Sequence, residues 1–172
     1  RTLRHQLEAF HGKTDPKALA VAWPHLGSPD RFIRWAGRTA IEHVPASHWS
    51  ERALTETDAS RRVEALLALA RATGVSPPHR KASSALVDTA LGRRLLQALA
   101  QTNWNALDAD RRAAFVRTAQ VALHRFGPFA SADTAGLLAK LDPLFPSTSA
   151  DLNWLLCETL VALRSPTVAT KA

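Results

Sequence analysis

Seven histidines, one cysteine and scattered hydroxyl and carboxyl groups are the residues of this chain that could perform chemistry. A zinc ion needs three or four ligands that converge on one point. The histidines show neither the His-x-x-x-His nor the His-Glu-x-x-His spacing that would place two ligands on one helix. His43 and His48 stand on either side of Pro45 and are expected in different helices. The sequence therefore predicts that no metal is bound.

Nucleophilic catalysis is equally unsupported. A catalytic serine or cysteine needs a base beside it, and the chain contains neither Gly-x-Ser-x-Gly nor Ser-x-x-Lys. Cys157 lies in the apolar run LNWLLCETLVAL, so we expect a buried small hydrophobic residue. Ser83 and Ser84 are expected to be ordinary loop and cap residues, and the glycines form no phosphate-binding cluster. We predict that the chain is not an enzyme and binds no cofactor.

Five tryptophans are the side chains best suited to hold a partner, because Trp and Arg are enriched at interface hot spots. Trp35 and Trp154 occupy the same place in two similar segments, and from this recurrence we expect both in the core. Trp23, Trp49 and Trp104 fall on or near outer helices and turns. We favour the interpretation that they pack one pair of helices against the next, and the alternative is that they contact a partner.

The charge of the chain allows one further class of partner. Lys and Arg together number 22 against 15 Asp and Glu, which gives a net charge of +7. Such a balance suits nucleic-acid binding. However, the basic residues are spread along the whole chain, and no aromatic platform alternates with them. Nucleic acid is therefore the less favoured partner, and no apolar run is long enough to insert into a membrane.

The elements that must position these residues are helical almost throughout. Between residues 108 and 126 the apolar side chains recur with a helical period, and no segment alternates like a β-strand. Prolines cut the chain into helix-sized pieces. The sequence predicts an all-α domain over residues 1–172, opened by a helix at about 2–11. The expected core includes Leu66, Leu69, Phe115, Leu123, Leu155 and Leu160.

One short pattern recurs four times along the chain. A capping residue precedes a polar residue by four positions, and an apolar helix follows; the pairs are Asp30 with Arg34, Asp58 with Arg62, Asp108 with Arg112, and Ser149 with Asn153. Asp and Ser at an N-cap accept hydrogen bonds from the unpaired N–H groups of the first turn. Each capped helix should follow another helix, and these are expected at 16–26, 46–56, 84–101 and 132–141. The pattern predicts about four stacked antiparallel helical hairpins, an α-solenoid.

Stacking should bring the three arginines of this pattern into a row. Such a row of Asp30, Arg34, Asp58, Arg62, Asp108 and Arg112 is either an ion-pair ladder between repeats or a basic surface for an acidic partner. We favour the structural interpretation, because each arginine has its own carboxylate to cancel the field. The capped helices, among them VEALLALA at 63–70 and LNWLLCETLVAL, lack a polar face and should be the more buried layer.

The segment SPDRFIRWAGRTAI resembles the second helix of a HEAT repeat, with Asp30 in the turn, Ile33 and Arg34 as the apolar–Arg pair, and small and apolar residues after them. The match is partial at Asp58–Arg62 and Asp108–Arg112 and weak at Ser149–Asn153. This resemblance implies a HEAT-like architecture and says nothing about activity.

A narrower resemblance rests on LRHQLEAFHG, on residues 22–54, on LDPLFP and on LNWLLCETLVAL. Together they are similar to a HEAT-like segment of large secreted haem-binding or dehydrogenase-like multidomain proteins of planctomycete-type bacteria. The resemblance implies a protein-interaction or spacer scaffold excised from a longer, exported polypeptide, which would place it in the periplasm or outside the cell. The alternative is a nucleic-acid-binding solenoid of the DNA-alkylation-repeat type. The haem itself is not implied here, since one cysteine cannot supply Cys-x-x-Cys-His.

Overall fold

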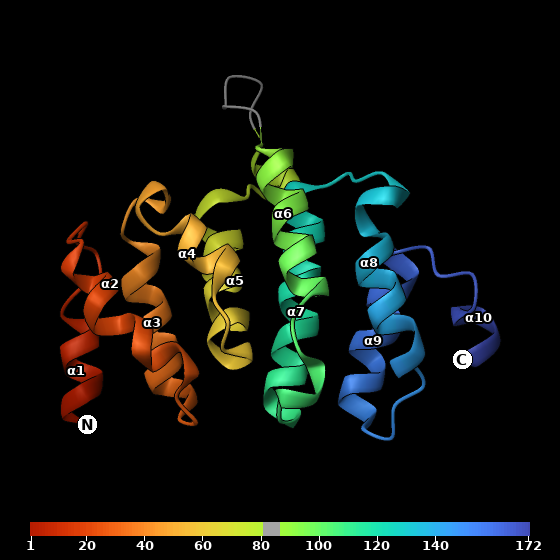
Figure 1. Ribbon diagram of the computed structural model, residues 1–172, viewed down its shortest axis with the longest axis horizontal. Coiled ribbons are helices and arrows are strands. Elements are labelled where there is room, and N and C mark those ends of the chain that lie inside the picture. Colours follow the sequence, from red (N-terminus) through yellow and green to blue (C-terminus); the bar gives the residue numbers. More distant parts are fainter. Residues whose placement is uncertain (81–86) are drawn as a thin grey trace.

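A computed structural model describes residues 1–80 and 87–172, and all of its regular structure in those ranges is helical (Figure 1). The predicted all-α class is confirmed. The α-helices are α1 Thr2–Glu8, α2 Lys17–Ala22, α3 Arg31–Glu42, α4 Ser50–Thr55, α5 Ala59–Thr73, α6 Thr89–Ala100, α7 Ala109–Phe126, α8 Ser131–Leu141, α9 Ala150–Ala162 and α10 Val168–Lys171. Short 3₁₀ turns join them: η1 Trp23–Gly27, η2 Ala46–His48, η3 Pro77–His79, η4 Trp104–Ala106 and η5 Asp142–Leu144.

The helices pack in order along the longest axis of the molecule (Figure 1). Helices α1, α3, α5, α7 and α9 form one row, in which each packs against the next. Helices α4, α6 and α8 form a second row beside it, and α2, α4, α6 and α8 each pack on the helix of the first row that follows them. Helix α1 contacts α3 as a member of the first row, which agrees with the prediction that a leading helix precedes the first pair.

All four expected capping residues start the expected helices. Asp30, Asp58, Asp108 and Ser149 are the N-caps of α3, α5, α7 and α9, and each side chain accepts a hydrogen bond from a backbone N–H of the first turn. These caps satisfy donors that would otherwise be unpaired at the helix start. The residue at which each of these four helices begins is therefore set by the local sequence.

Three of the four preceding helices are shorter than the sequence predicts, whereas α8 agrees with the predicted 132–141 to within one residue. Pro24 ends α2 and turns the chain into η1, because a proline has no N–H to continue the α-helical hydrogen bonds. The predicted helix at 46–56 is divided at Trp49, between η2 and α4. Helix α6 begins only after the cap Asp88, while Ser83 and Ser84 lie outside the described residues. The short terminal helix α10 was not predicted.

The core runs along the interface between the two rows. Helix α5 is buried on nearly all sides, as expected for VEALLALA. Of the expected core, Leu66, Leu69, Phe115, Leu155 and Leu160 are buried and Leu123 is half-buried. The prediction is wrong for α9, which exposes 64% of Trp154 and 60% of Val161 and only half buries Cys157. Among the described helices none is both long and apolar enough to cross a membrane.

Candidate functional site

Two arginines of the recurring pattern, Arg34 and Arg62, bind backbone carbonyls and not the capping carboxylates. Arg34 Nη1 donates to the carbonyls of Ser28 and Pro29 at 2.9 and 2.8 Å. Arg62 Nε donates to the carbonyl of Glu56. Each side chain thus folds back to the residue two positions before its own N-cap. The arginine therefore fixes the turn that leads into its helix.

The expected Asp–Arg ladder is therefore corrected. Within residues 1–80 and 87–172, no ion pair joins Asp30, Asp58 or Asp108 to an arginine of the pattern. The physical reason is that each carboxylate already accepts from helix N–H groups, at 2.8 Å from Phe32 N in the case of Asp30. Arg112 is different again, since its guanidinium lies 5.5 Å from the ring centre of Trp104.

Asn153 makes the equivalent contact in the fourth segment, but its side chain accepts the hydrogen bond where the arginines donate it. Its Oδ1 accepts a hydrogen bond of 2.8 Å from the backbone N–H of Ser147. Ser147 again stands two positions before the N-cap, here Ser149. An uncharged side chain thus fixes the turn in the same way, which shows that positive charge is not what this position requires.

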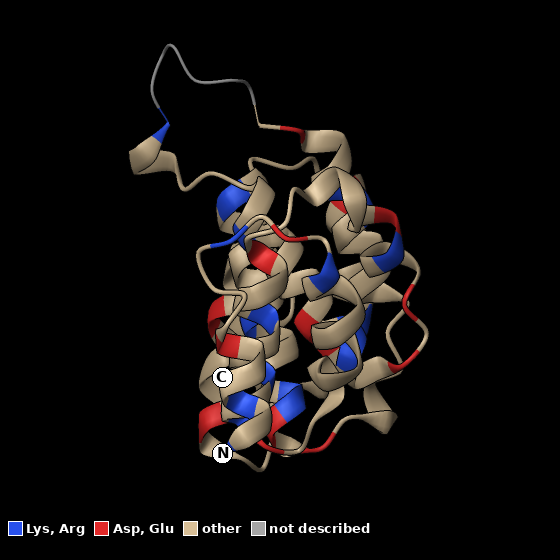
Figure 2. Ribbon diagram, turned by 90° about the vertical axis from the view of Figure 1, so that its left-hand side faces the viewer, with Lys and Arg blue, Asp and Glu red and all other residues tan. Residues whose placement is uncertain are grey.

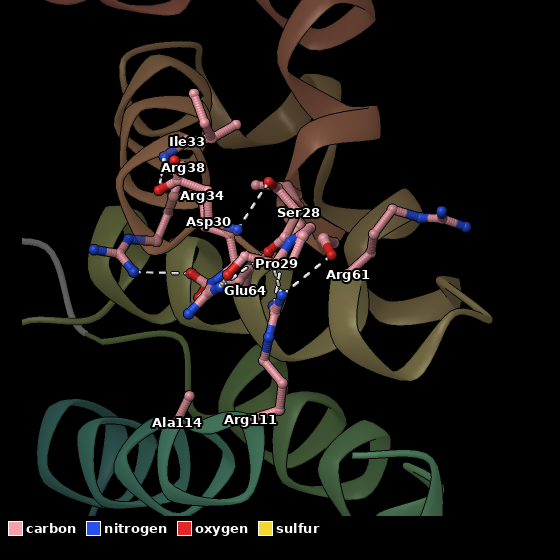
Figure 3. Close-up of polar contacts among 12 residues, drawn as sticks. Ser28, Pro29, Asp30, Ile33, Arg34, Arg38, Arg61, Glu64, Arg111 and Ala114 are labelled. Atoms are coloured by element: carbon pink, nitrogen blue, oxygen red, sulfur yellow. Dashed lines mark hydrogen bonds and ion pairs between the residues drawn. The ribbon is translucent and has the colours of Figure 1, made fainter. Parts of the chain in front are cut away.

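A buried ionic cluster joins α3, α5 and α7 (Figure 3). Glu64 of α5, 2% exposed, lies 2.8 Å from Arg38 Nη1 and 3.4 Å from Arg34 Nε. Arg111 of α7, also 2% exposed, donates to the carbonyls of Leu26, Gly27 and Ser28. Burial lowers the pKa of Arg111, and the positive charge of Arg34 lowers it further.

Sequence reasoning missed this cluster, although one signal was present. Glu64 is the one charged residue in VEALLALA. A carboxylate on a helix that is apolar all round must find a buried cation, because an unpaired buried charge is strongly unfavourable. Arg111 carried no comparable signal, since it lies in the run Asp110–Arg112, where an exposed helix start was expected.

Trp23, Trp49 and Trp104 pack inside the fold, as the favoured interpretation predicts. Trp23 and Trp49, candidate partner contacts, are each only 1% exposed and meet edge to face. Their indole N–H groups donate to Glu56 Oε2 at 2.7 Å and to the Val44 carbonyl at 3.0 Å. Trp104 is half-buried against Phe115. These three side chains pack helices together, and Trp23 and Trp49 offer no surface for a partner, so the alternative of partner contact is wrong for these two residues.

Glu56, the acceptor for the Trp23 indole, is a tightly held carboxylate. Its partial burial by itself raises the pKa. Hydrogen bonds from Trp23, from the Asp58 N–H and from Arg61 outweigh that effect and lower the pKa to about 2. The carboxylate is therefore ionised across the physiological range and serves the turn between α4 and α5.

Trp35 and Trp154, expected in the core, are exposed at 45% and 64%. Both follow their capping residue by five positions, on α3 and α9. Recurrence in a stacked array marks an equivalent position, and that position can face solvent as readily as the core. Phe32, 48% exposed, packs edge to face against Trp35 with ring centres 5.8 Å apart. The guanidinium of Arg31 lies 4.9 Å from the Phe32 ring centre and 5.4 Å from that of Trp35.

Catalytic and metal-binding groups do not gather elsewhere in the described parts of the chain. No group of three His, Cys, Asp or Glu side chains there could hold a metal ion. One serine–histidine contact does form, between Ser76 Oγ and His124 Nε2 at 2.8 Å. Among the described residues no carboxylate accepts a hydrogen bond from His124, so the pair lacks the group that orients a catalytic histidine.

Comparison of the chain with protein-family models, with curated proteins and with solved structures finds no match. The function must therefore be argued from the contacts of the chain itself.

Proposed function

We propose that this chain is an α-solenoid of HEAT-like hairpins that binds a protein segment and performs no catalysis. The ordered packing of helix pairs supports the repeat architecture, since each pair buries its apolar face against the next. In keeping with the resemblance of its sequence, we infer that the module serves as a docking or spacer element in a larger, exported polypeptide.

The observation that carries the proposal is the exposed aromatic cluster of Arg31, Phe32 and Trp35 on α3, and Trp154 is exposed separately on α9. Large apolar side chains that remain exposed and lie together mark interaction sites, and Trp and Arg supply much of the binding energy at interfaces. Trp35 and Trp154 take equivalent positions on α3 and α9. Equivalent positions on stacked helices face the same side, so one extended segment could contact both.

The charge of this surface indicates the chemistry of the partner. Arg31 lies over two aromatic rings and forms no ion pair in the described ranges. A carboxylate of a partner could pair with this guanidinium while an apolar side chain packs on Phe32 and Trp35. The expected partner is therefore an extended peptide segment that carries acidic and large apolar residues.

Nucleic acid remains the less favoured partner. Figure 2 shows Lys and Arg interspersed with Asp and Glu over the ribbon in that view, without a separate basic side. Many arginines are also occupied within the fold: Arg34 and Arg111 bind backbone carbonyls, and Arg94 pairs with Glu51 at 2.6 Å. A surface that binds phosphates needs clustered cations that are free to neutralise them.

A peptide selection tests the proposal. Random peptides displayed on phage are selected on the immobilised chain, and the enriched sequences are synthesised and titrated by fluorescence anisotropy. We expect enrichment of acidic residues beside large apolar ones. Trp35→Ala and Trp154→Ala should each weaken the selected peptides by at least about tenfold, as at an interface hot spot.

Val21→Ala is the matched control, because Val21 is a comparably exposed apolar residue outside this cluster, at 39%. It should leave the peptide affinity unchanged. Equal affinity of all selected peptides for the wild-type chain and for both tryptophan variants would contradict the proposal. Tight binding of duplex DNA at physiological salt, unchanged in the tryptophan variants, would favour the nucleic-acid alternative.

A further inference from the structure

A cavity of about 360 Å³ lies where the end of α7, the start of α8 and the end of α9 meet. It is separate from the aromatic cluster on α3. Leu123, Phe129 and Leu163 give it an apolar wall, and His124, Ser131 and Arg164 give it a polar one. A concave site of this size that combines apolar side chains with a few polar groups has the usual form of a small-molecule site.

Arg164 is the most unusual residue of the wall. It follows Leu163, the C-cap of α9, and its backbone has φ 57, the only positive φ of a non-glycine residue in the described chain. Glycine is the usual residue after a helix C-cap, because it has no Cβ to clash in this conformation. No hydrogen bond or ion pair of the Arg164 guanidinium occurs among the described residues. Arg164 is solvent-exposed and lines the cavity, so its guanidinium is available to a ligand without competition from an acceptor among the described residues.

The remaining polar wall also favours a negatively charged group. Ser131 is the first residue of α8, and the first N–H groups of a helix have no acceptor within the helix. The nearest acidic residue of that turn, Asp133, is already engaged: its carboxylate accepts from Ala130 N at 3.2 Å and pairs with Arg93 at 3.1 Å. His124 contributes an imidazole whose Nε2 contacts Ser76.

We propose that this cavity binds a small apolar carboxylate. Arg164 and Ser131 hold the acid group, and the hydrocarbon part packs against Leu123, Phe129 and Leu163. The pairing of a guanidinium with a carboxylate is a strong charge-assisted contact, and the apolar wall selects acids with a ring or a branched chain over acetate. The proposal does not depend on the peptide-binding function of the α3 surface.

Phenylacetate is a suitable probe, titrated by isothermal calorimetry and by amide chemical-shift changes on the full chain. We expect binding of one equivalent, with shifts confined to the residues around the cavity. Phenylacetamide has the same shape without the charge and should bind at least about tenfold more weakly, because it loses the charged hydrogen bond. Acetate, which lacks the apolar part, should also bind more weakly.

Arg164→Gly separates recognition from folding. Glycine relieves the positive φ, so this variant should be at least as stable as the wild-type chain in thermal unfolding. It should nevertheless lose phenylacetate affinity by about tenfold or more. Ala162→Phe should block the cavity while leaving Arg164 in place, and Arg4→Ala, which removes an exposed guanidinium from α1, should leave binding unchanged.

Several results would overturn the proposal. These are equal affinity for phenylacetate and phenylacetamide, unchanged affinity in Arg164→Gly, or shift changes centred on residues away from the cavity. Equal binding of inorganic phosphate and phenylacetate would also overturn it, because the apolar wall would then contribute nothing.

Discussion

At the residue scale, several arginines of this chain bind its own backbone carbonyls. Arg34 and Arg111 both donate to the carbonyl of Ser28, one from the adjoining helix and one from α7. Glu64 supplies the buried negative charge beside Arg34 and Arg38. Arg34, Arg111 and Glu64 are almost completely buried. The free energy of burying each of these charges therefore depends on the presence of the others.

Replacing Glu64 by Gln should therefore be costly. The change keeps the shape of the side chain but leaves two arginines without their buried carboxylate. We expect a loss of about 3 kcal/mol in the free energy of unfolding, measured by urea titration.

Glu8→Gln is the matched control for this prediction. Glu8 pairs with Arg4 on the exposed side of α1, with the Glu8 side chain 37% exposed. Such a surface pair contributes about 0–1 kcal/mol. Similar losses for the two variants would show that the Glu64 cluster adds little to stability.

Residue types alone could not place the tryptophans or the arginine contacts. Trp35 and Trp154 were correctly matched as equivalent positions, but equivalence does not state which side of the helix the neighbours cover. Arg111 could not be found, because its acceptors lie 83 to 85 residues earlier in the chain. Such a contact follows from the stacking of helices and not from any local pattern.

At the scale of helices, the sequence predicted starts better than ends. The four capping residues mark their helices because their side chains bind the first turn directly. Ends depend on weaker signals. The leading helix stops at Glu8, before the predicted residue 11, and the chain then reaches Gly12 with φ 75. Helix α10 has only four residues and depends on tertiary contacts that no local pattern reveals.

Helix α5 should be the most sensitive to truncation of its side chains. Leu66 is completely buried there, so Leu66→Ala removes apolar contacts and leaves a cavity. We expect a loss of about 2–5 kcal/mol in the free energy of unfolding by urea titration. The same change at half-buried Leu123 should cost clearly less, and the reverse order would contradict the burial of α5.

The carboxylate of Asp142 anchors helix α10. Asp142 binds Lys171 Nζ at 2.6 Å and the hydroxyls of Ser165 and Thr167. The hydrogen bond from Lys171 lowers the pKa of Asp142 most, and those from Ser165 and Thr167 lower it further, to about 2. Because this pKa lies below the ordinary value of 3.8, the contact stabilises the docked helix above that pH and is lost as the pH falls towards 2.

Asp142→Asn should therefore release α10 at neutral pH. The amide chemical shifts of Val168 and Ala169 should move towards the values that the wild-type chain reaches in acid. Asp110→Asn, at an exposed carboxylate of α7, is the control and should leave these shifts unchanged. Unaltered Val168 shifts in Asp142→Asn would show that other contacts hold the helix.

At the scale of the molecule, each helix of the first row is stabilised mainly by its neighbours. Helices α3, α5 and α7 have a neighbour on both sides in their row, whereas α1 and α9 end it. In such an array, stability is approximately a sum of unit and interface contributions. The terminal helices should therefore open before the central ones.

Hydrogen exchange followed by mass spectrometry measures this order. We expect the slowest amide exchange in α5 and α7 and faster exchange in α1, α9 and α10, because local opening needs fewer contacts to break at the ends. Uniform protection along the whole chain would instead indicate a single cooperative unit.

The reach of Arg111 back to residues 26–28 has a consequence for the order in which the protein matures during synthesis. A ribosome adds about 5–20 residues per second, so several seconds separate the turn from the arginine that completes it. Until Arg111 emerges, the carbonyls of Leu26 and Gly27 lack this donor. The amino-terminal helices of the nascent chain thus reach their final packing only after α7 has been made.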